Sequence, residues 1–178
     1  MQKRTMIVDE TTGEIVSDKS RTISAAFDEE KGYLLWPRKN FARSFADIDF
    51  PAQMTMIDRG RMATLAKRIW SNTNMLGYRG NGGVRPYDYS KIGEVIGLKE
   101  RQARTFVDKM VRFGVMAKVN IEIEGKKEIH FYVSPLYFFS SNRIPLNLYL
   151  IFRKQLDAVL PQWVIQRFRE QKVIDLGG

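Results

Sequence analysis

The chain has 178 residues, no cysteine and a formal net charge of +9, and 44% of its residues are hydrophobic. This length and composition predict a globular protein, either one well-packed domain or a core domain with appendages, and not a disordered chain. The absence of cysteine excludes disulfide frameworks, thiolate zinc sites and cysteine nucleophiles.

The positive charge is concentrated in the middle of the sequence. Residues 57–118 hold thirteen Lys or Arg against five Asp or Glu, whereas residues 1–50 hold eight against nine and residues 119–178 hold eight against six. Binding to nucleic-acid phosphates requires concentrated positive charge of this kind. The middle segment is therefore the candidate nucleic-acid surface, although basic surfaces also serve solubility or RNA binding.

Neither end of the chain resembles a membrane segment. The N-terminus turns acidic at Asp9 and Glu10 and lacks the apolar core of a signal peptide. The apolar run at residues 148–152 is far too short to span a bilayer. We expect a soluble, cytoplasmic protein with no membrane partner.

Residues 1–50 are interpreted as an N-terminal extension. The β-prone pairs Ile7-Val8 and Ile15-Val16 flank Thr11-Thr12-Gly13, which predicts a small hairpin over residues 5–17. Residues 32–45 then interleave aromatic side chains with basic ones. Such a mixture can stack on nucleic acid. Aromatic runs of this kind more often dock on their own domain or on a partner subunit, and we favour docking.

A helix is predicted from Asp58, as its N-cap, to about Asn72. Its buried stripe would contain Met62, Leu65, Ala66 and Ile69. The glycine-rich segment 72–88 follows and predicts a long loop, a feature that often signals function or mobility. It lacks the Gly-Lys-Ser/Thr of a phosphate-binding nucleotide loop. Arg79 and Arg85 make it a candidate DNA-backbone contact; a plain surface loop is the alternative.

Residues 89–114 predict two helices separated by a tight turn. The first covers residues 90–96, the turn is Gly97-Leu98-Lys99, and the second helix covers residues 100–113 and stops at Gly114. Four apolar residues of the second helix recur at three- and four-residue steps and share one buried face: Ala103, Phe106, Met110 and Phe113. The opposite face carries Arg101, Gln102, Arg104, Thr105, Asp108, Lys109 and Arg112. Glu100 and Arg104 stand four residues apart in the favourable order for an ion pair.

Residues 115–133 alternate as two strands around Gly125. Val119, Ile121 and Ile123 alternate with polar residues on the first strand, and Ile129, Phe131 and Val133 do so on the second. This period of two predicts a hairpin with one buried face and one wet face. Lys126 and Lys127 would stand at its tip. Helix, turn, basic helix and hairpin are the order of a winged helix-turn-helix, so we predict an α+β fold with such a core over residues 51–134. The alternative is another small α+β domain with an amphipathic helix.

Residues 135–178 predict a C-terminal helical segment. Pro145 fits the first turn of a helix through about Leu156, and Pro161 could start another through Gln171. Apolar stripes would come from Leu146, Leu150, Val159, Leu160, Val164 and Phe168. The winged core does not need these helices to close itself. We therefore expect them to form a homodimer interface with Tyr149, Trp163 and Phe168, or else to cover the N-terminal aromatic segment.

Catalytic and metal-binding patterns are missing from the sequence. His130 is the single histidine, on the expected exposed phase of a strand, which leaves no two-histidine metal site and no Ser-His arrangement. Asp47, Asp49 and the acidic run 28–30 lack the further carboxylates of a two-metal nuclease. We expect no enzyme activity, no metal and no cofactor.

The second helix of the core, residues 100–113, is expected to lie in the major groove of double-stranded DNA. Base edges would be read by Arg101, Gln102, Arg104 and Thr105, because arginine can bind guanine, and glutamine adenine, through two hydrogen bonds. Phosphates would be held by Ser90, Lys91, Lys109, Arg112, Lys126, Lys127, Arg79 and Arg85, which set the register without reading sequence. A dimer should prefer inverted half-sites.

The chain resembles the RepL-type plasmid replication proteins of Firmicutes. The resemblance is carried by residues 8–15 (Val-Asp-Glu-Thr-Thr-Gly-Glu-Ile), by the winged core, and by residues 133–138 (Val-Ser-Pro-Leu-Tyr-Phe) before a Leu/Tyr-rich helix. The core is also similar to the MarR-like winged regulators, whose dimers form through terminal helices. The glycine-rich segment and residues 32–45 are not part of the RepL pattern.

The resemblance implies a phage or plasmid DNA-binding protein that initiates or controls replication. A transcriptional regulator with the same binding mode is the first alternative. A protein-interaction module that binds a host polymerase or replication factor is the second, and the clustering of positive charge argues against it.

Overall fold

The structure of the chain is a computed structural model. It describes the strands 2–8, 15–22, 27–28 and 32–33, and residues 42–70, 73–81, 83–123, 125–141 and 143–175. Two compact units are present, residues 1–38 and 39–178. No helix of the described residues is long and apolar enough to cross a membrane.

The first unit contains the hairpin that the sequence predicts at the N-terminus. Strand β1 (Gln2–Val8) pairs antiparallel with β2 (Ile15–Thr22), so the strands extend on both sides of the predicted range. Strands β3 (Phe27–Asp28) and β4 (Gly32–Tyr33) form a second antiparallel pair. The rest of this unit, including Arg38 of the aromatic segment, lies outside the described residues.

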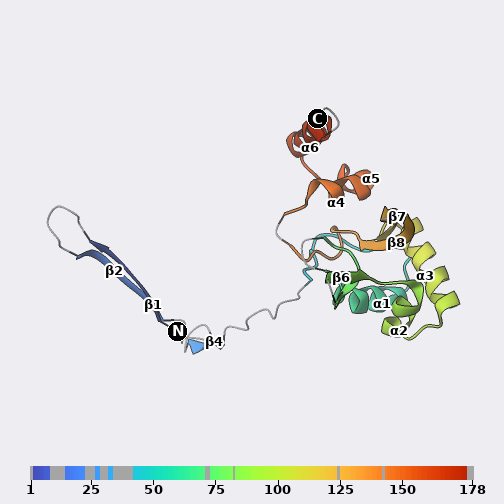
Figure 1. Ribbon diagram of the computed structural model, residues 1–178, viewed down its shortest axis with the longest axis horizontal. Helices are drawn as coiled ribbons and strands as arrows, with labels where there is room; N and C mark the ends of the chain where they lie inside the picture. Colours follow the sequence, from blue (N-terminus) through green and yellow to red (C-terminus); the bar gives the residue numbers. More distant parts are fainter. Residues whose placement is uncertain are drawn as a thin grey trace. The chain divides into compact units, whose positions relative to one another are not determined.

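The second unit is a mixed α+β structure, which confirms the predicted class (Figure 1). In chain order its elements are α1 (Met56–Ala66), β5 (Gly77–Gly80), β6 (Gly83–Pro86), α2 (Tyr89–Ile96), α3 (Glu100–Arg112), β7 (Met116–Ile123), β8 (Lys126–Val133), α4 (Leu146–Ile151), α5 (Arg153–Leu156) and α6 (Gln162–Asp175). Helix α2 packs on both α1 and α3, and β5–β6 and β7–β8 are antiparallel hairpins.

Helices α2 and α3 form as the sequence predicts, with a sharp turn between them. The Asp88 side chain accepts a hydrogen bond from the Lys91 backbone N–H at 2.7 Å and caps α2. Gly97 ends α2 with φ +69°, a left-handed conformation that favours glycine. Gly93 is required by the close approach of the turn, because a Cβ there would collide with the carbonyl oxygen of Leu98.

Helix α1 starts and ends earlier than predicted. Its N-cap is Thr55, whose hydroxyl accepts from the Asp58 backbone N–H at 3.2 Å, so the prediction of Asp58 as N-cap is wrong. The helix ends at Ala66, not near Asn72, because the chain turns there and Ile69 pairs with Leu76 in a β-bridge. The predicted apolar stripe of four residues is buried nevertheless.

The predicted long loop at 72–88 is a folded segment with its own hairpin, β5–β6. Asn74 anchors its start. This buried residue has a backbone φ of +56°. Its side-chain nitrogen donates to the carbonyl oxygens of Val133 and Phe138 at 3.0 and 2.7 Å, and its side-chain oxygen accepts from the Ser140 backbone N–H at 3.2 Å. The glycine content of the segment predicts a loop. The sequence does not predict the folded segment, because the long-range hydrogen bonds of Asn74 leave no local sequence pattern.

The β7–β8 hairpin has a register that the alternation of the two strands does not predict. Ile123 pairs with Lys126 across a two-residue turn, so Val119 faces His130 and Phe131 faces Lys118. Directly paired residues share a face of a sheet. The two apolar sets of the strands therefore lie on opposite faces, and the prediction of one buried and one wet face is wrong.

Both faces of the hairpin base are covered. Phe131, Val133 and Met116 belong to the core formed with α1, α2 and α3. Tyr132 belongs to a second core formed with α4 and α5, against which Ala117 and Val119 pack. The hairpin is thus the central layer between two sets of helices.

The C-terminal helices lie close to their predicted ranges, but a different stripe is buried. The first predicted helix is split at Phe152 into α4 and α5, and the second extends to Asp175. Among the side chains described in this segment, Leu148, Tyr149, Phe152, Leu156 and Ile165 are buried. Leu150 and Val159 of the predicted stripes are exposed.

Residues 42–50 belong to the second unit and include the end of the aromatic segment, residues 42–45, where Phe45 is 47% exposed. Docking of the aromatic side chains of residues 32–45 stays a prediction. Arg43 and Phe139 exchange two backbone hydrogen bonds of 2.9 Å. Phe50 stacks on Tyr137 with ring centroids 4.9 Å apart. This stretch therefore packs on residues 135–139, whereas Lys39 lies outside the described residues.

We expect Asn74→Ala to lower the free energy of unfolding by about 3 kcal/mol, because buried carbonyl and N–H groups lose their partners at a left-handed backbone position. Asn74→Gly loses the same hydrogen bonds but accepts the backbone conformation, so it should be less destabilising than the alanine variant. Urea denaturation followed by circular dichroism measures both. Equal losses in the two variants, or a loss below about 1 kcal/mol for alanine, would contradict this account.

Candidate nucleic-acid interface

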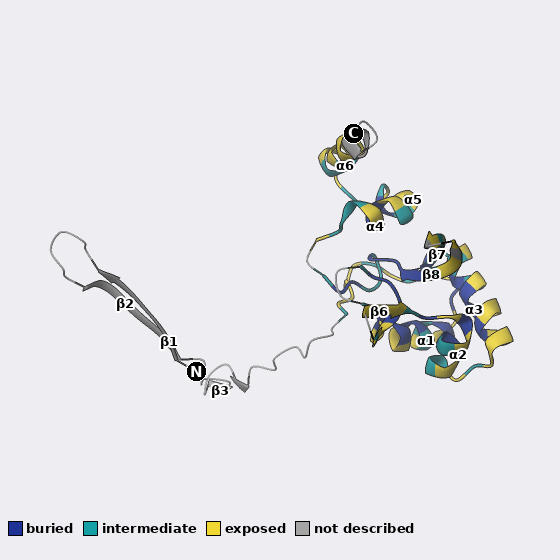
Figure 2. Ribbon diagram, in the orientation of Figure 1, coloured by how far each residue is buried: buried dark blue, intermediate teal, exposed yellow. Residues whose placement is uncertain are grey.

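Helix α3 has one buried face and one polar face. Ala103, Phe106, Val107 and Met110 are buried, and the stripe directly opposite them is exposed. That stripe consists of Arg101, Thr105, Asp108 and Arg112. Figure 2 shows the outer side of α3 as exposed along the helix. A solvent-exposed helix face that carries arginines is what a recognition helix needs in order to contact DNA.

Arg101 and Arg104 both remain on the surface. Arg101 is exposed, and its side chain makes no hydrogen bond or ion pair within the described part of the chain. The Arg104 guanidinium lies over the ring of Tyr89, 4.4 Å from its centroid, and 3.7 Å from the Glu100 carboxylate, which confirms the predicted ion pair. Its side chain is still 57% exposed. The Tyr89 ring therefore orients Arg104 without covering it.

Gln102 and Thr105 are exposed but already make local hydrogen bonds. The Lys99 backbone N–H donates to Gln102 Oε1 at 3.1 Å, so Gln102 helps to cap the start of α3. The Thr105 hydroxyl donates to the carbonyl oxygen of Arg101 at 3.2 Å. Two-bond recognition of adenine needs both the oxygen and the nitrogen of a glutamine amide. Gln102 in this conformation is thus better suited to capping than to reading a base.

Lys109 forms an ion pair inside the fold. Its Nζ lies 2.7 Å from Oδ2 of Asp58, a carboxylate that also accepts a hydrogen bond of 2.8 Å from the Thr55 hydroxyl. Burial raises the pKa of Asp58, but the hydrogen bonds from Lys109 and Thr55 and the charge of Lys109 outweigh it, and the pKa lies below its ordinary value. The charge of Lys109 is therefore committed to holding α3 against α1.

The other predicted phosphate-binding residues are spread over several elements. Ser90 and Arg112 are exposed, and Lys91 pairs with Glu94 at 2.6 Å along α2. Lys127 is exposed on β8 beside the hairpin tip, whereas the side chain of Lys126 is outside the described residues.

Arg79 and Arg85 lie on the β5–β6 hairpin and are exposed. In its register Tyr78 pairs with Arg85, and Arg79 pairs with Val84, so the two arginines lie on opposite faces of this hairpin. Only one of them can therefore face a single DNA backbone.

Three cations near α3 are not singled out by the sequence patterns: Arg61, Lys99 and Lys118. Arg61 projects from α1 toward Phe106, with its Cζ 5.9 Å from the ring centroid. It lines a hollow of about 340 Å³ together with Gln102, Thr105 and Lys109. The charge excess of residues 57–118 includes Arg61, but its place beside α3 depends on how α1 packs.

His130 is less accessible than predicted. Its side chain is 12% exposed, and its Nε2 lies 3.3 Å from Oε2 of Glu128. The register explains the difference, because His130 pairs with Val119 on the face that packs against the C-terminal helices. Within the described ranges, no group of three or more metal-ligating side chains comes together.

Comparisons of the chain with protein-family models, with curated proteins and with solved structures gave no match. A function must therefore be inferred from the chain's own side chains.

The depressed pKa of Asp58 gives a testable dependence of stability on pH. Its stabilising contribution is present above the pKa of an unfolded aspartate, near 4, and is lost as the pH falls through the lower folded pKa. We expect Asp58→Asn to lower the free energy of unfolding by about 2 kcal/mol at neutral pH, less than for a fully buried pair because Lys109 is one-third exposed. The difference from the unmodified chain should shrink as the pH falls below about 4.

Asp108→Asn is the matched control, since this exposed carboxylate pairs with Lys118 at 3.3 Å on the surface. Its effect should be below about 0.5 kcal/mol. Urea unfolding at a series of pH values measures both variants. A difference for Asp58→Asn that does not change with pH would rule out the ionised pair as its cause.

Proposed function

We propose that this chain binds double-stranded DNA through a winged helix-turn-helix formed by residues 51–134. Helices α1, α2 and α3 would be the helical part and β7–β8 the wing, with α3 lying in the major groove. The observation that carries the proposal is the outer face of α3. Its arginines are solvent-exposed, and the side chain of Arg101 makes no hydrogen bond or ion pair with the described residues.

In this proposal Arg101 and Arg104 read base edges. Both lie in the N-terminal half of α3, the part of a recognition helix that reaches the bases. An arginine guanidinium can donate two hydrogen bonds to O6 and N7 of guanine. The Tyr89 ring supports this role for Arg104, because stacking restricts the guanidinium before DNA is bound. Thr105 lies beside Arg101 on the same stripe and could contact a neighbouring base.

Phosphates would be held by side chains that flank α3 and by the two hairpins. The group comprises Ser90, Lys91, Arg112, Lys126 and Lys127, together with Arg79 or Arg85. Such contacts fix the orientation of the protein on the duplex and carry no sequence information. In this scheme Lys109 and Gln102 are structural residues of α3, because each already bonds a group of the protein.

We further propose, on the RepL resemblance, that the bound site belongs to a plasmid or phage and that binding initiates or controls replication. A transcriptional regulator would use the same surface. Selection and mapping of bound fragments from the parent replicon distinguish the two. A cluster of fragments at an origin supports the replication role, and scattered promoter fragments support the regulator.

We expect Arg101→Ala to reduce the preference for the selected site over random DNA by an amount corresponding to about 1–3 kcal/mol. The exposed side chain makes no contact whose loss would disturb the fold. Lys127→Ala is the matched variant on the hairpin. It should weaken binding to both DNAs by a similar factor and reduce the slope of log affinity against log salt by about one.

Fluorescence anisotropy with the selected and random duplexes, over a salt series, measures these changes. Equal losses of specificity in the two variants would contradict the assignment of roles. Binding that does not weaken with added salt, or the absence of any DNA binding above background, would count against the proposal as a whole.

A further inference from the structure

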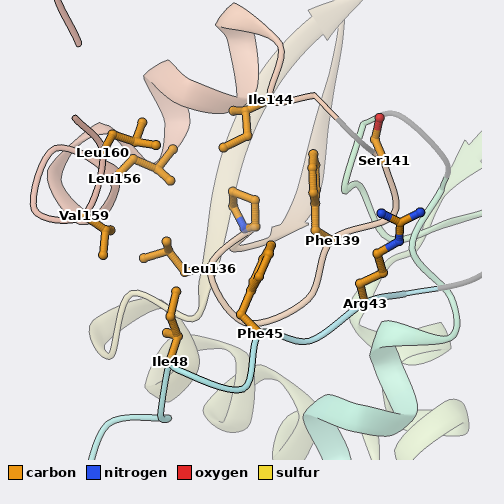
Figure 3. A pocket seen from close by; sticks show the side chains of 11 residues that line it. Arg43, Phe45, Ile48, Leu136, Phe139, Ser141, Ile144, Leu156, Val159 and Leu160 are labelled. Carbon is orange, nitrogen blue, oxygen red and sulfur yellow. The ribbon is translucent and has the colours of Figure 1, made fainter. Parts of the chain in front are cut away.

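An apolar hollow in the second unit is lined in part by residues that come just before an exposed tryptophan in the chain. The hollow has a volume of about 420 Å³ and is lined by segments 43–48, 135–144 and 156–160. Figure 3 shows the side chains of Ile48, Leu136 and Val159 directed toward its centre. Trp163 follows three residues after the lining residue Leu160 and is 71% exposed.

Two apolar side chains that line the hollow are exposed to solvent. Phe45 and Val159, which both line it, are 47% and 53% exposed. A monomer usually keeps contiguous apolar surface of this kind covered, and where it does not the surface marks a binding site. A large exposed aromatic next to an apolar hollow has the character of an interface anchor and its receptor.

Helix α6 directs Trp163 away from its own subunit. Ile165 is buried, and the ring of Phe168 stacks on Tyr149 with centroids 4.2 Å apart. These two residues define the face of α6 that packs inward, and Trp163 and Arg167 stand four residues apart on the other face. Tyr149 and Phe168 therefore contribute to the fold of one subunit, and of the three aromatics expected at an interface only Trp163 is available.

The charges beside the anchor and the hollow are complementary. Arg167 has 78% of its side chain exposed and lies 3.4 Å from the carboxylate of Glu170 on the same helix. Ile48 of the hollow is flanked in sequence by Asp47 and Asp49, which are both exposed. The acidic pair that flanks this lining residue thus carries the charge opposite to that of Arg167, which shares a face of α6 with Trp163.

We propose that Trp163 inserts into the hollow of a second copy of this chain, so that two copies pair about a two-fold axis. A surface that holds both anchor and receptor is self-complementary, which a two-fold dimer requires. Each dimer contains two insertions, and each Arg167 lies near Asp47 and Asp49 of the partner. The inference does not rest on DNA binding, because pairing of the copies is measured without DNA.

The test is sedimentation equilibrium of the full chain over a wide range of concentration. We expect a dimer for the unmodified chain. Trp163→Ala should raise the dissociation constant of the dimer by about a hundredfold, roughly tenfold for each lost anchor. Tyr78→Ala is the control, since this aromatic on β5 is 41% exposed and does not line the hollow. It should leave the dissociation constant unchanged.

A mixture of two variants tests the insertion itself. Val159→Glu places a charge in the hollow but keeps the anchor, whereas Trp163→Ala keeps the hollow but removes the anchor. Neither variant alone can form an insertion. The mixed pair retains one of the two, so its dissociation constant should lie between those of the unmodified dimer and of the two variant dimers.

Charge reversal provides a second, independent measurement. Arg167→Glu should weaken the dimer by bringing like charges together, and the further changes Asp47→Lys and Asp49→Lys in the same chain should restore it. A chain that is monomeric at all concentrations, a Trp163→Ala dimer as tight as the unmodified one, or a mixed pair no tighter than either variant would overturn the proposal. Binding of a small apolar ligand or of lipid vesicles by a monomeric chain would overturn it as well.

Discussion

The register of the β7–β8 hairpin is the constraint on which the rest of the second unit depends. A two-residue turn pairs Ile123 with Lys126 and so decides which residues share a face. A shift of β8 by one residue relative to β7 would move each side chain of β8 to the opposite face of the hairpin. In the observed register Phe131 enters the core of α1, α2 and α3, and Tyr132 enters the core of α4 and α5. Strand β8 thus contributes side chains to both cores, and its backbone holds the helices on both sides of the hairpin in place.

This arrangement separates two surfaces of different chemistry. On one side α3 is fixed by its buried face and by the ion pair of Lys109 with Asp58, and its outer face stays cationic. On the other side α6 is fixed through the stacked rings of Tyr149 and Phe168, and Trp163 stays exposed. If the two proposals hold, the hairpin is the rigid connection between a DNA-reading helix and a dimer contact. The spacing of two DNA half-sites would then follow from the dimer geometry.

Much of the candidate surface can be predicted from local sequence, and the exceptions share one cause. The ends of α3, the burial of three predicted apolar residues (Ala103, Phe106 and Met110) and the exposure of Arg101 follow from three- and four-residue periodicity and from Gly114. Phe113 of the predicted stripe is only partly buried, and Val107 is buried although the stripe did not include it. The role of Lys109 does not follow from this periodicity, because its partner Asp58 stands 51 residues away. Asn74 is missed for the same reason: its side chain bonds to Val133 and Phe138 across a similar separation.

The sequence by itself determined the α+β class, the order of α1, α2, α3, β7 and β8, and the concentration of positive charge on residues 57–118. These are local properties, since periodicity and capping act within a few residues. Only the tertiary structure decided which strand faces are covered, that segment 73–88 folds as a hairpin, and that Trp163 is left outside while Tyr149 is buried. Those outcomes depend on contacts between residues that are distant in the chain. Such contacts stabilise the fold but produce no local periodicity in the sequence, so they cannot be predicted from it.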